Sequence, residues 1–181
     1  MSDEDRRRWD ERYEGREPVS LDEVSPPPVF EAFAELFPTS GHALDVACGR
    51  GATAVWLARR GMTVTGFDVS PVAIAQAGEL ALTCGVQDRC EFVVTDLDGG
   101  LPAGPVADVV VCHRFRDARL DGAIISRLAP GGLLAISALS EVGASPGPFR
   151  VAAGELSRAF AALEPIAQGE GGGEAWLLAR G

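Results

Sequence analysis

The 181-residue sequence predicts a single α/β domain with a Rossmann-like, three-layer architecture: a seven-stranded, mostly parallel sheet with helices on both faces. From residue 42 onward, short apolar segments alternate with segments of helical periodicity, which indicates strand–helix–strand units. The strand candidates are nearly continuous apolar runs, such as ADVVVC at 107–112, and this is typical of strands covered on both faces. We expect residues 1–38 to form an N-terminal helical lid on an α/β core that comprises residues 42–181.

The N-terminal segment contains two helix candidates. Residues 3–14 predict a polar helix with Ser2 as its N-cap. Trp9 and Tyr13 are four residues apart and therefore share one face of it. Residues 29–37 carry apolar side chains at i, i+3, i+4 and i+7, which predicts a short amphipathic helix.

The core elements follow in order, and turn chemistry marks several of their ends. Ser70 followed by Pro71 is a typical N-cap and first helical residue. Gly61 suits the end of a helix, and residues 130–132 (PGG) predict a sharp turn into a strand. The expected strands are 42–49, 62–68, 90–96, 107–112 and 133–139, with short extended pieces around Ile166 and Trp176; the expected helices are 53–60, 71–83, 120–128 and 154–163.

The composition excludes several chemistries. Acidic residues number 26 and basic residues 16, for a net charge of −10, and every basic residue is arginine. Without lysine there is no P-loop lysine for a nucleoside triphosphate and no Schiff-base lysine. The negative charge disfavours binding to a phosphate backbone, so we expect no nucleic-acid partner.

The four cysteines form no CxxC pair, and the chain has only two histidines, so we expect neither a metal site nor a disulfide framework. Small buried thiols in a reducing compartment are the alternative. The charged N-terminus has no apolar signal region, and no apolar run reaches the roughly 18 residues of a membrane span. We therefore expect a cytoplasmic protein without a membrane partner, as a monomer or weak homodimer.

The strongest motif is Asp45-Val46-Ala47-Cys48-Gly49-Arg50-Gly51, at the end of the first strand and the start of a helix. Glycines at this place let the backbone approach a ligand closely, and the helix N-terminus behind them favours negative groups. Many α/β turns also need glycine for structural reasons alone.

Two carboxylates follow at the ends of the next strands. Asp68 lies 17 residues after Gly51, where a carboxylate can accept hydrogen bonds from both hydroxyls of a ribose. Asp96 ends the third strand, where it can accept from an adenine amino group while Leu97 covers the ring. Their structural alternatives are a helix-initiating Asp and a loop Asp, but the ordered set favours a nucleoside ligand.

The order ALDVACGRG, GFDVSP, VVTDLD, ADVVVC and LAPGGLLAIS, over about residues 42–139, resembles the class I methyltransferases that use S-adenosylmethionine. Trp9-Asp10-x-x-Tyr13 and the closing WLLAR segment are similar to the small-molecule branch, which includes thiopurine and tellurite-resistance methyltransferases. The resemblance implies an antiparallel last strand, S-adenosylmethionine as cofactor with S-adenosylhomocysteine as product, and a small-molecule methyl acceptor. Ala47 departs from the family pattern, which often has glycine there, and we expect its methyl group to be tolerated.

The same resemblance implies residue roles. Gly49 and Gly51 would lie under the methionine part of the cofactor, and Asp45 would lie close to its amino group. Asp68 would hold the ribose hydroxyls, and Asp96 with Leu97 would face the adenine. The residues expected to bind the cofactor are Asp45, Gly49, Gly51, Asp68, Val69, Asp96, Leu97 and Cys112.

The acceptor is expected beyond the strand at 107–112. Methyl transfer from a sulfonium is an in-line displacement that depends mainly on alignment, and a base matters only if the acceptor arrives protonated. His113 is the candidate catalytic base, because its ordinary pKa is near neutral; a packing role is its alternative. Arg114, Arg116 and Arg119 are candidates for attracting an anionic acceptor, or they belong to a solvated loop.

Trp9, Tyr13 and Phe115 are candidates for an aromatic wall near the sulfonium, or the first two simply dock their helix. Two other functions stay open. Residues 49–54 also fit the dinucleotide fingerprint GxGxxA, so an NAD(P)-binding oxidoreductase is possible, although the chain has no lysine for a Tyr-x-x-x-Lys pair. A non-catalytic cofactor-binding module is the third interpretation. For a methyl acceptor, a thiol or other soft nucleophile is the first guess.

Overall fold

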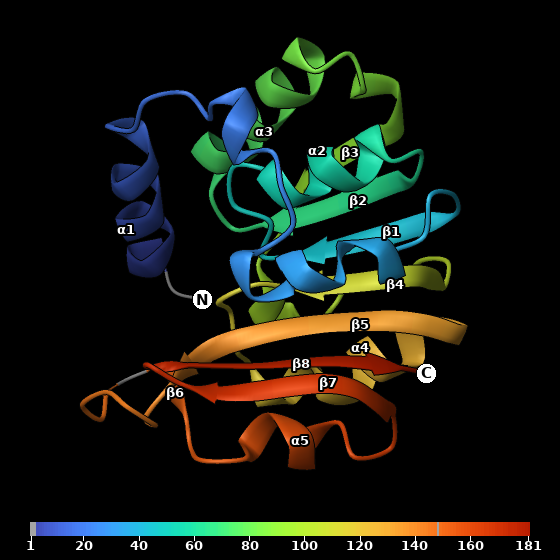
Figure 1. Cartoon of the computed structure of the whole chain (residues 1–181). Helices are drawn as coiled ribbons and strands as arrows, with labels where there is room; N and C mark the ends of the chain where they lie inside the picture. Colours follow the sequence, from blue (N-terminus) through green and yellow to red (C-terminus); the bar gives the residue numbers. More distant parts are fainter. Residues whose placement is uncertain (1–2, 148) are drawn as a thin grey trace.

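The computed structural model describes residues 3–147 and 149–181, and it contains one mixed β-sheet with helices on both faces (Figure 1). Seven strands lie in the order β3-β2-β1-β4-β5-β8-β7, and the short strand β6 pairs with β5. The strands are β1 His42–Val46, β2 Thr63–Asp68, β3 Cys90–Val94, β4 Ala107–Cys112, β5 Leu128–Ser140, β6 Arg150–Val151, β7 Glu164–Gly171 and β8 Glu174–Arg180. The predicted α/β class is confirmed, with one two-residue strand beyond the seven expected.

The strand directions determine where a ligand can bind. Strands β3, β2, β1, β4 and β5 are parallel, whereas β8 is antiparallel to both β5 and β7. The antiparallel last strand is therefore confirmed. The strand order reverses between β1 and β4, and open α/β sheets bind ligands outside the carboxyl ends of their strands at such a point.

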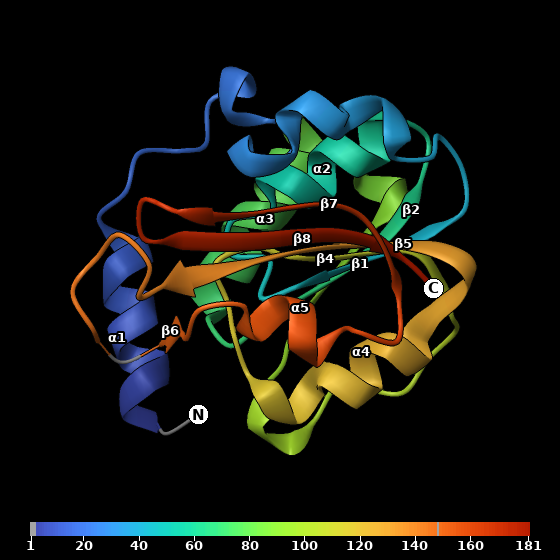
Figure 2. The ribbon, with the colours of Figure 1, turned by 60° about the horizontal axis from the view of Figure 1, so that its bottom comes forward.

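Alternating side chains along each strand build two separate cores. Ala43 of β1 faces a cluster that includes Phe30 and Leu57, and the next residue, Leu44, faces a cluster that includes Ile124. This period of two is the geometry of a strand covered on both sides. Figure 2 shows α2 on one side of the sheet and α4 and α5 on the other, which confirms the three layers. The helices are α1 Asp3–Glu14, α2 Ala52–Arg59, α3 Pro71–Thr83, α4 Asp121–Arg127 and α5 Glu155–Ala159.

The N-terminal helix α1 packs against α3 and lies on the side of the sheet where β1 has its carboxyl end, on the left of Figure 1. Ser70 caps α3 as predicted, because its Oγ accepts a hydrogen bond from the backbone N–H of Ala73 at 3.1 Å. Ser2, the predicted N-cap of α1, lies outside the described residues. Within the described ranges, no helix has the length and apolar character needed to cross a membrane.

Three elements differ from their predicted form. The segment Pro28–Leu36 is a 3₁₀ helix and not an α-helix, and it buries Phe30 completely against the sheet. It begins with the backbone N–H of Phe30 bonded to the carbonyl of Pro27, an i→i+3 contact that follows a run of prolines without N–H groups.

The other two differences come from pairing and burial. The predicted PGG turn is a bend inside β5. This strand starts to pair with β4 at Leu128, opposite Ala107, and Leu128 precedes Gly131 and its φ of 76° in the chain. Helix α5 ends at Ala159 because Phe160 and Leu163 turn into the core formed with α4.

Candidate active site

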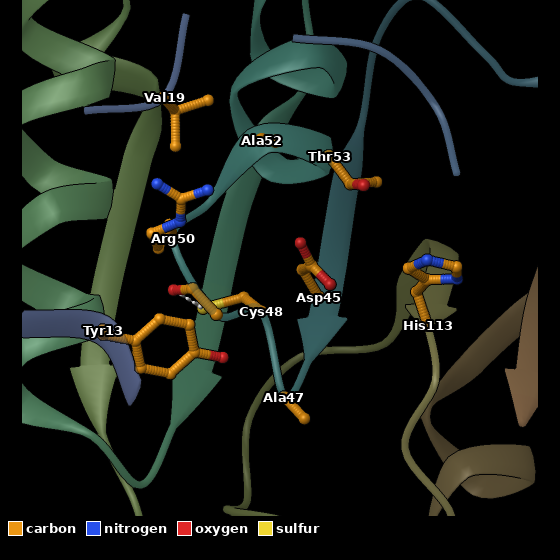
Figure 3. Close-up of a pocket in the computed structure, with 10 residues that line it drawn as sticks. Tyr13, Val19, Asp45, Ala47, Cys48, Arg50, Ala52, Thr53 and His113 are labelled. Atoms are coloured by element: carbon orange, nitrogen blue, oxygen red, sulfur yellow. Dashed lines mark hydrogen bonds between the residues drawn. The ribbon is translucent and has the colours of Figure 1, made fainter. Parts of the chain in front are cut away.

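A pocket of about 230 Å³ lies at the carboxyl ends of β1 and β4 (Figure 3). The turn after β1 and the start of α2 line it, Tyr13 reaches it from α1 on one side, and His113 lies on the other side, with Asp45 between them. The lining residues are Tyr13, Val19, Asp45, Ala47, Cys48, Gly49, Arg50, Ala52, Thr53 and His113. The fold thus brings the glycine-rich motif and His113, predicted separately, to one pocket.

The turn between β1 and α2 requires an unusual backbone. Gly51 has a φ of 77°, and a Cβ at this position would lie 2.7 Å from the Cβ of Ala77 in α3, so only glycine fits. Ala47 has a φ of 57°, a left-handed conformation that L side chains rarely adopt. The turn therefore accommodates the methyl group of Ala47, but with backbone strain.

Asp45 is a buried carboxylate with an unused oxygen. Its side chain is 3% exposed, and its Oδ2 has no hydrogen-bond partner. Burial, and secondarily the nearby charge of Asp68, raise its pKa to about 7, while a hydrogen bond from the backbone of Ala54 works in the opposite direction. A cationic donor in the pocket would satisfy this oxygen and restore its ionised form.

Asp68 ties the turn to the end of β2. Its Oδ2 accepts from the backbone N–H of Gly49 at 2.8 Å, and its Oδ1 accepts from that of Ser70 at 3.0 Å. Burial raises its pKa, and these hydrogen bonds oppose the rise. A carboxylate has about four acceptor positions, so the ribose role stays a prediction beside this structural one.

The remaining residues predicted to bind the cofactor do not line the pocket. Asp96 is exposed at the end of β3, where it accepts from the backbone N–H of Asp98 at 2.9 Å. Leu97 and Cys112 are buried in the same core cluster, and Val69 is 7% exposed. Burial raises the pKa of Cys112 far above its usual range.

Tyr13 covers the glycine turn from above. Its hydroxyl would lie 3.2 Å from a Cβ at Gly49, and its ring stacks on Trp9 with 5.9 Å between centroids. Trp9 does not line the pocket. Burial, and then the charge of Asp68, raise the pKa of Tyr13 to about 12, so its hydroxyl remains protonated. The amide of Gln76 donates to the carbonyl of Tyr13 at 3.1 Å and holds the helix in this place.

His113 and the residues after it have engaged side chains. His113 Nδ1 lies 2.8 Å from Ser137 Oγ, and burial lowers its pKa. Arg114 is exposed and pairs with Glu174 at 3.1 Å. Phe115 packs against the core cluster of Leu97 and does not line the pocket.

The expectation that Arg116 attracts an anionic acceptor is wrong. Its side chain is only 8% exposed and pairs with Asp121 at 2.5 Å and Glu155 at 3.1 Å. Arg119 is exposed but already pairs with Asp98 and Asp117. Both arginines therefore have carboxylate partners within the chain.

Sequence reasoning missed Ser137, Glu174, Val19 and Thr53. The sequence offers a sign of a role for Ser137, because it is the lone polar residue in the apolar run LLAISAL. Thr53 comes just after the glycine-rich motif in the sequence, whereas Glu174 and Val19 become neighbours of the site only through tertiary packing. Within residues 3–147 and 149–181, no group of three His, Cys, Asp or Glu side chains is arranged to hold a metal ion.

Known proteins resemble this chain in sequence and in fold. A family model described as a methyltransferase domain matches residues 43–132. The 2-heptyl-1-hydroxyquinolin-4(1H)-one methyltransferase of Mycobacteroides abscessus is 30% identical over 159 residues, which cover 81% of this chain and 67% of that protein.

Two further known proteins share a smaller part of their length or a lower sequence identity with this chain. The ribosomal RNA small subunit methyltransferase C of Alcanivorax borkumensis is 35% identical over 111 residues, which cover 56% of this chain and only 33% of that protein. The crystal structure of TehB from Haemophilus influenzae superposes with a TM-score of 0.73 at 19% identity, covering 97% of this chain and 66% of that one. The likeness to TehB shows the fold alone.

Proposed function

The chain belongs to the methyltransferase family, and from that premise we propose that it transfers the methyl group of S-adenosylmethionine to a small-molecule acceptor. The resemblance to methyltransferases, stated above from the motifs, is confirmed by the family match and by the relative in Mycobacteroides abscessus, and the fold of TehB agrees with the fold that it implies. The observation that carries the choice of cofactor is the unpartnered carboxylate oxygen of Asp45 beside the glycine turn.

The residues present fit S-adenosylmethionine. An ammonium group is the donor that the buried Oδ2 of Asp45 lacks, and the turn at Gly49 leaves the backbone open to a ligand. When bound, this cofactor supplies a methyl group on a sulfonium, already activated for displacement. Asp68, at the end of the neighbouring strand, is the proposed partner of the ribose hydroxyls.

The chain's own contribution is alignment and exclusion of water. Holding two reactants in an attacking geometry can supply about 7–11 kcal/mol of a barrier. The pocket of about 230 Å³ is smaller than the roughly 300–1,000 Å³ of most ligand sites. We therefore propose that α1 with Tyr13 and Trp9 is a lid, which moves away to admit the ligands and returns over them.

A small acceptor fits the charge of the molecule better than a nucleic acid does. The net charge is −10, and Arg114, Arg116 and Arg119 are paired with carboxylates. A relative of which this chain spans 67% is named for a hydroxyquinolone, whereas the chain spans 33% of the RNA methyltransferase. A small aromatic hydroxy compound is the proposed acceptor class; a monomeric or weakly dimeric, cytoplasmic protein remains our prediction.

Ligand binding tests this function directly. We expect S-adenosylhomocysteine to raise the melting temperature, since ligand at 100 times its dissociation constant adds about 2.7 kcal/mol of stability, and NADH to have no effect. Asp45→Asn is expected to weaken the binding of S-adenosylhomocysteine by about tenfold or more, because a hydrogen bond to a charged group is lost. The exposed Asp88→Asn is the matched control. A shift with NADH alone, or with neither ligand, contradicts the proposal.

A further inference from the structure

Ser137 and His113 form a buried contact at the acceptor side of the pocket. Ser137 is fully buried in β5, and its Oγ lies 2.8 Å from Nδ1 of His113, the residue directly after β4. The backbone N–H of Arg114 also points at this Oγ, at 3.2 Å. The parallel pairing of Cys112 with Ile136 sets this register, so the strands themselves bring the hydroxyl to the ring.

Only one placement of the hydrogens on Ser137 and His113 gives every donor in this contact an acceptor. The backbone N–H of Arg114 can only donate, so it occupies one lone pair of the Ser137 oxygen. The hydroxyl hydrogen then needs an acceptor, and among the described residues Nδ1 of His113 is the one that is within reach. If Nδ1 carried the proton instead, two donors would meet at the oxygen and the hydroxyl hydrogen would be buried without an acceptor, which is costly.

We infer that Ser137 holds His113 in the tautomer with its hydrogen on Nε2, and that this N–H donates a hydrogen bond to the methyl acceptor. Ser137 is thus a positioning residue, and His113 orients the acceptor and does not remove its proton. Nε2 has no hydrogen-bond partner among the described residues, and the ring lines the pocket on the side away from Tyr13 (Figure 3). Burial lowers the pKa of His113, while the charge of Glu174 opposes this, so the ring is neutral near pH 7.

This tautomer limits the acceptors that the pocket can use, a step that rests on the proposed function. Tyr13 and Cys48 line the pocket as protonated groups, because burial raises the pKa of each. Asp45 is the proposed partner of the cofactor's ammonium group. No lining side chain is then left to take a proton from a hydroxyl acceptor, so such an acceptor has to enter the pocket as its anion, which favours an acidic hydroxyl compound.

The transfer balances without a base. The acceptor oxyanion forms a bond to the methyl carbon while the bond from that carbon to the sulfonium sulfur breaks, and its electron pair stays on sulfur. A neutral methyl ether and a neutral thioether result, and no proton is released. The hydrogen bond from Nε2 fixes the direction of the oxyanion, either at the attacking oxygen or at an oxygen next to it.

Nuclear magnetic resonance reads the tautomer without any turnover. Long-range ¹H–¹⁵N spectra of histidine-labelled protein, with and without S-adenosylhomocysteine, show two imidazoles, and His113→Gln assigns them because His42 is the other one. We expect the pattern of a neutral ring protonated at Nε2 at pH 7.5, and a mixture of tautomers in Ser137→Ala. A ring protonated at Nδ1, or a charged ring, in the wild-type protein overturns the inference, whether or not S-adenosylhomocysteine binds.

Kinetics then separate a donor from a base, with 2-heptyl-1-hydroxyquinolin-4(1H)-one as the probe acceptor. Glutamine keeps an N–H donor but cannot take a proton, so His113→Gln should keep the wild-type pH profile and lose less activity than His113→Leu, which should raise KM about tenfold or more. Equal loss in both variants overturns the donor role. Binding of S-adenosylhomocysteine without methylation of the probe by the wild-type protein overturns the acceptor class and leaves the cofactor assignment standing.

Discussion

Ser70 Oγ donates a hydrogen bond to Asp10 Oδ1 at 2.5 Å, and this contact joins α1 to the first turn of α3. The same oxygen accepts from the backbone N–H of Ala73, so one hydroxyl both caps α3 and anchors the proposed lid. Together with the bond from Gln76 to the carbonyl of Tyr13, it places the aromatic ring over the glycine turn.

Breaking this contact from either side has different consequences. Asp10→Ala should speed amide hydrogen exchange in residues 3–14 while leaving the free energy of unfolding nearly unchanged. Ser70→Ala should do the same and also lower the free energy of unfolding by about 1 kcal/mol, because the helix cap is lost. Exchange measured by mass spectrometry and urea unfolding check both, with the exposed Glu11→Ala as control. Unchanged exchange in Asp10→Ala contradicts the anchoring role.

The buried Asp45 makes stability depend on pH. Its pKa is raised from an ordinary 3.8 to about 7, so the unfolded chain releases the proton first. The free energy of unfolding therefore falls as pH rises from about 4 to about 7. In Asp45→Asn this fall should be smaller, which urea unfolding at pH 4, 6 and 8 measures. A parallel pH dependence in both proteins would show that folding does not raise the pKa of Asp45.

Ala47 in its left-handed conformation offers a stabilising substitution. Ala47→Gly should raise the free energy of unfolding by about 1 kcal/mol, because glycine adopts this backbone without steric cost. The exposed Ala75 in the middle of α3 is the matched control, and glycine there should lower stability by about 1 kcal/mol. Thermal unfolding of the two variants gives shifts of opposite sign; shifts of the same sign count against the strain.

Arg116 has a structural role, so its removal should lower the free energy of unfolding and leave ligand affinity unchanged. Arg116→Ala leaves the carboxylates of Asp121 and Glu155 without their partner, which should cost about 3 kcal/mol in urea unfolding. Arg119→Ala, with 66% of that side chain exposed, should leave the free energy of unfolding nearly unchanged, because solvent screens its ion pairs. A loss of affinity for S-adenosylhomocysteine in folded Arg116→Ala would restore a role in the site.

Local chemistry explains which parts of the fold the sequence predicts well. The start of α3 follows from Ser70 and Pro71, because a cap and its first helical residue are neighbours in the chain. The pocket follows from motif order, since parallel strands bring their carboxyl ends to one edge. The glycine turn and His113 therefore meet at the pocket, although 64 residues separate Gly49 from His113.

Features that depend on pairing between distant segments could not be predicted in the same way. The partners of Arg116 come from α4 and the start of α5, and nothing in the local sequence distinguishes this arginine from a solvated one. The hydroxyl of Ser137 meets His113 only because β4 and β5 pair in one register. The bend at Gly131 also needs β4, which keeps the chain in the sheet on both sides of it.

The end of β8 lies far from the pocket. Gly181 exchanges backbone hydrogen bonds with Gly131 and Gly132, both at 2.9 Å, at the amino end of β5. The pocket lies at the carboxyl ends of the parallel strands, beside α1, on the other side of the sheet from the C-terminus (Figure 1). A fluorophore or surface linker attached after Gly181 should therefore leave ligand entry unobstructed. The same attachment ahead of α1 would be carried by the proposed lid, so the C-terminal side is the better attachment point for immobilised binding measurements.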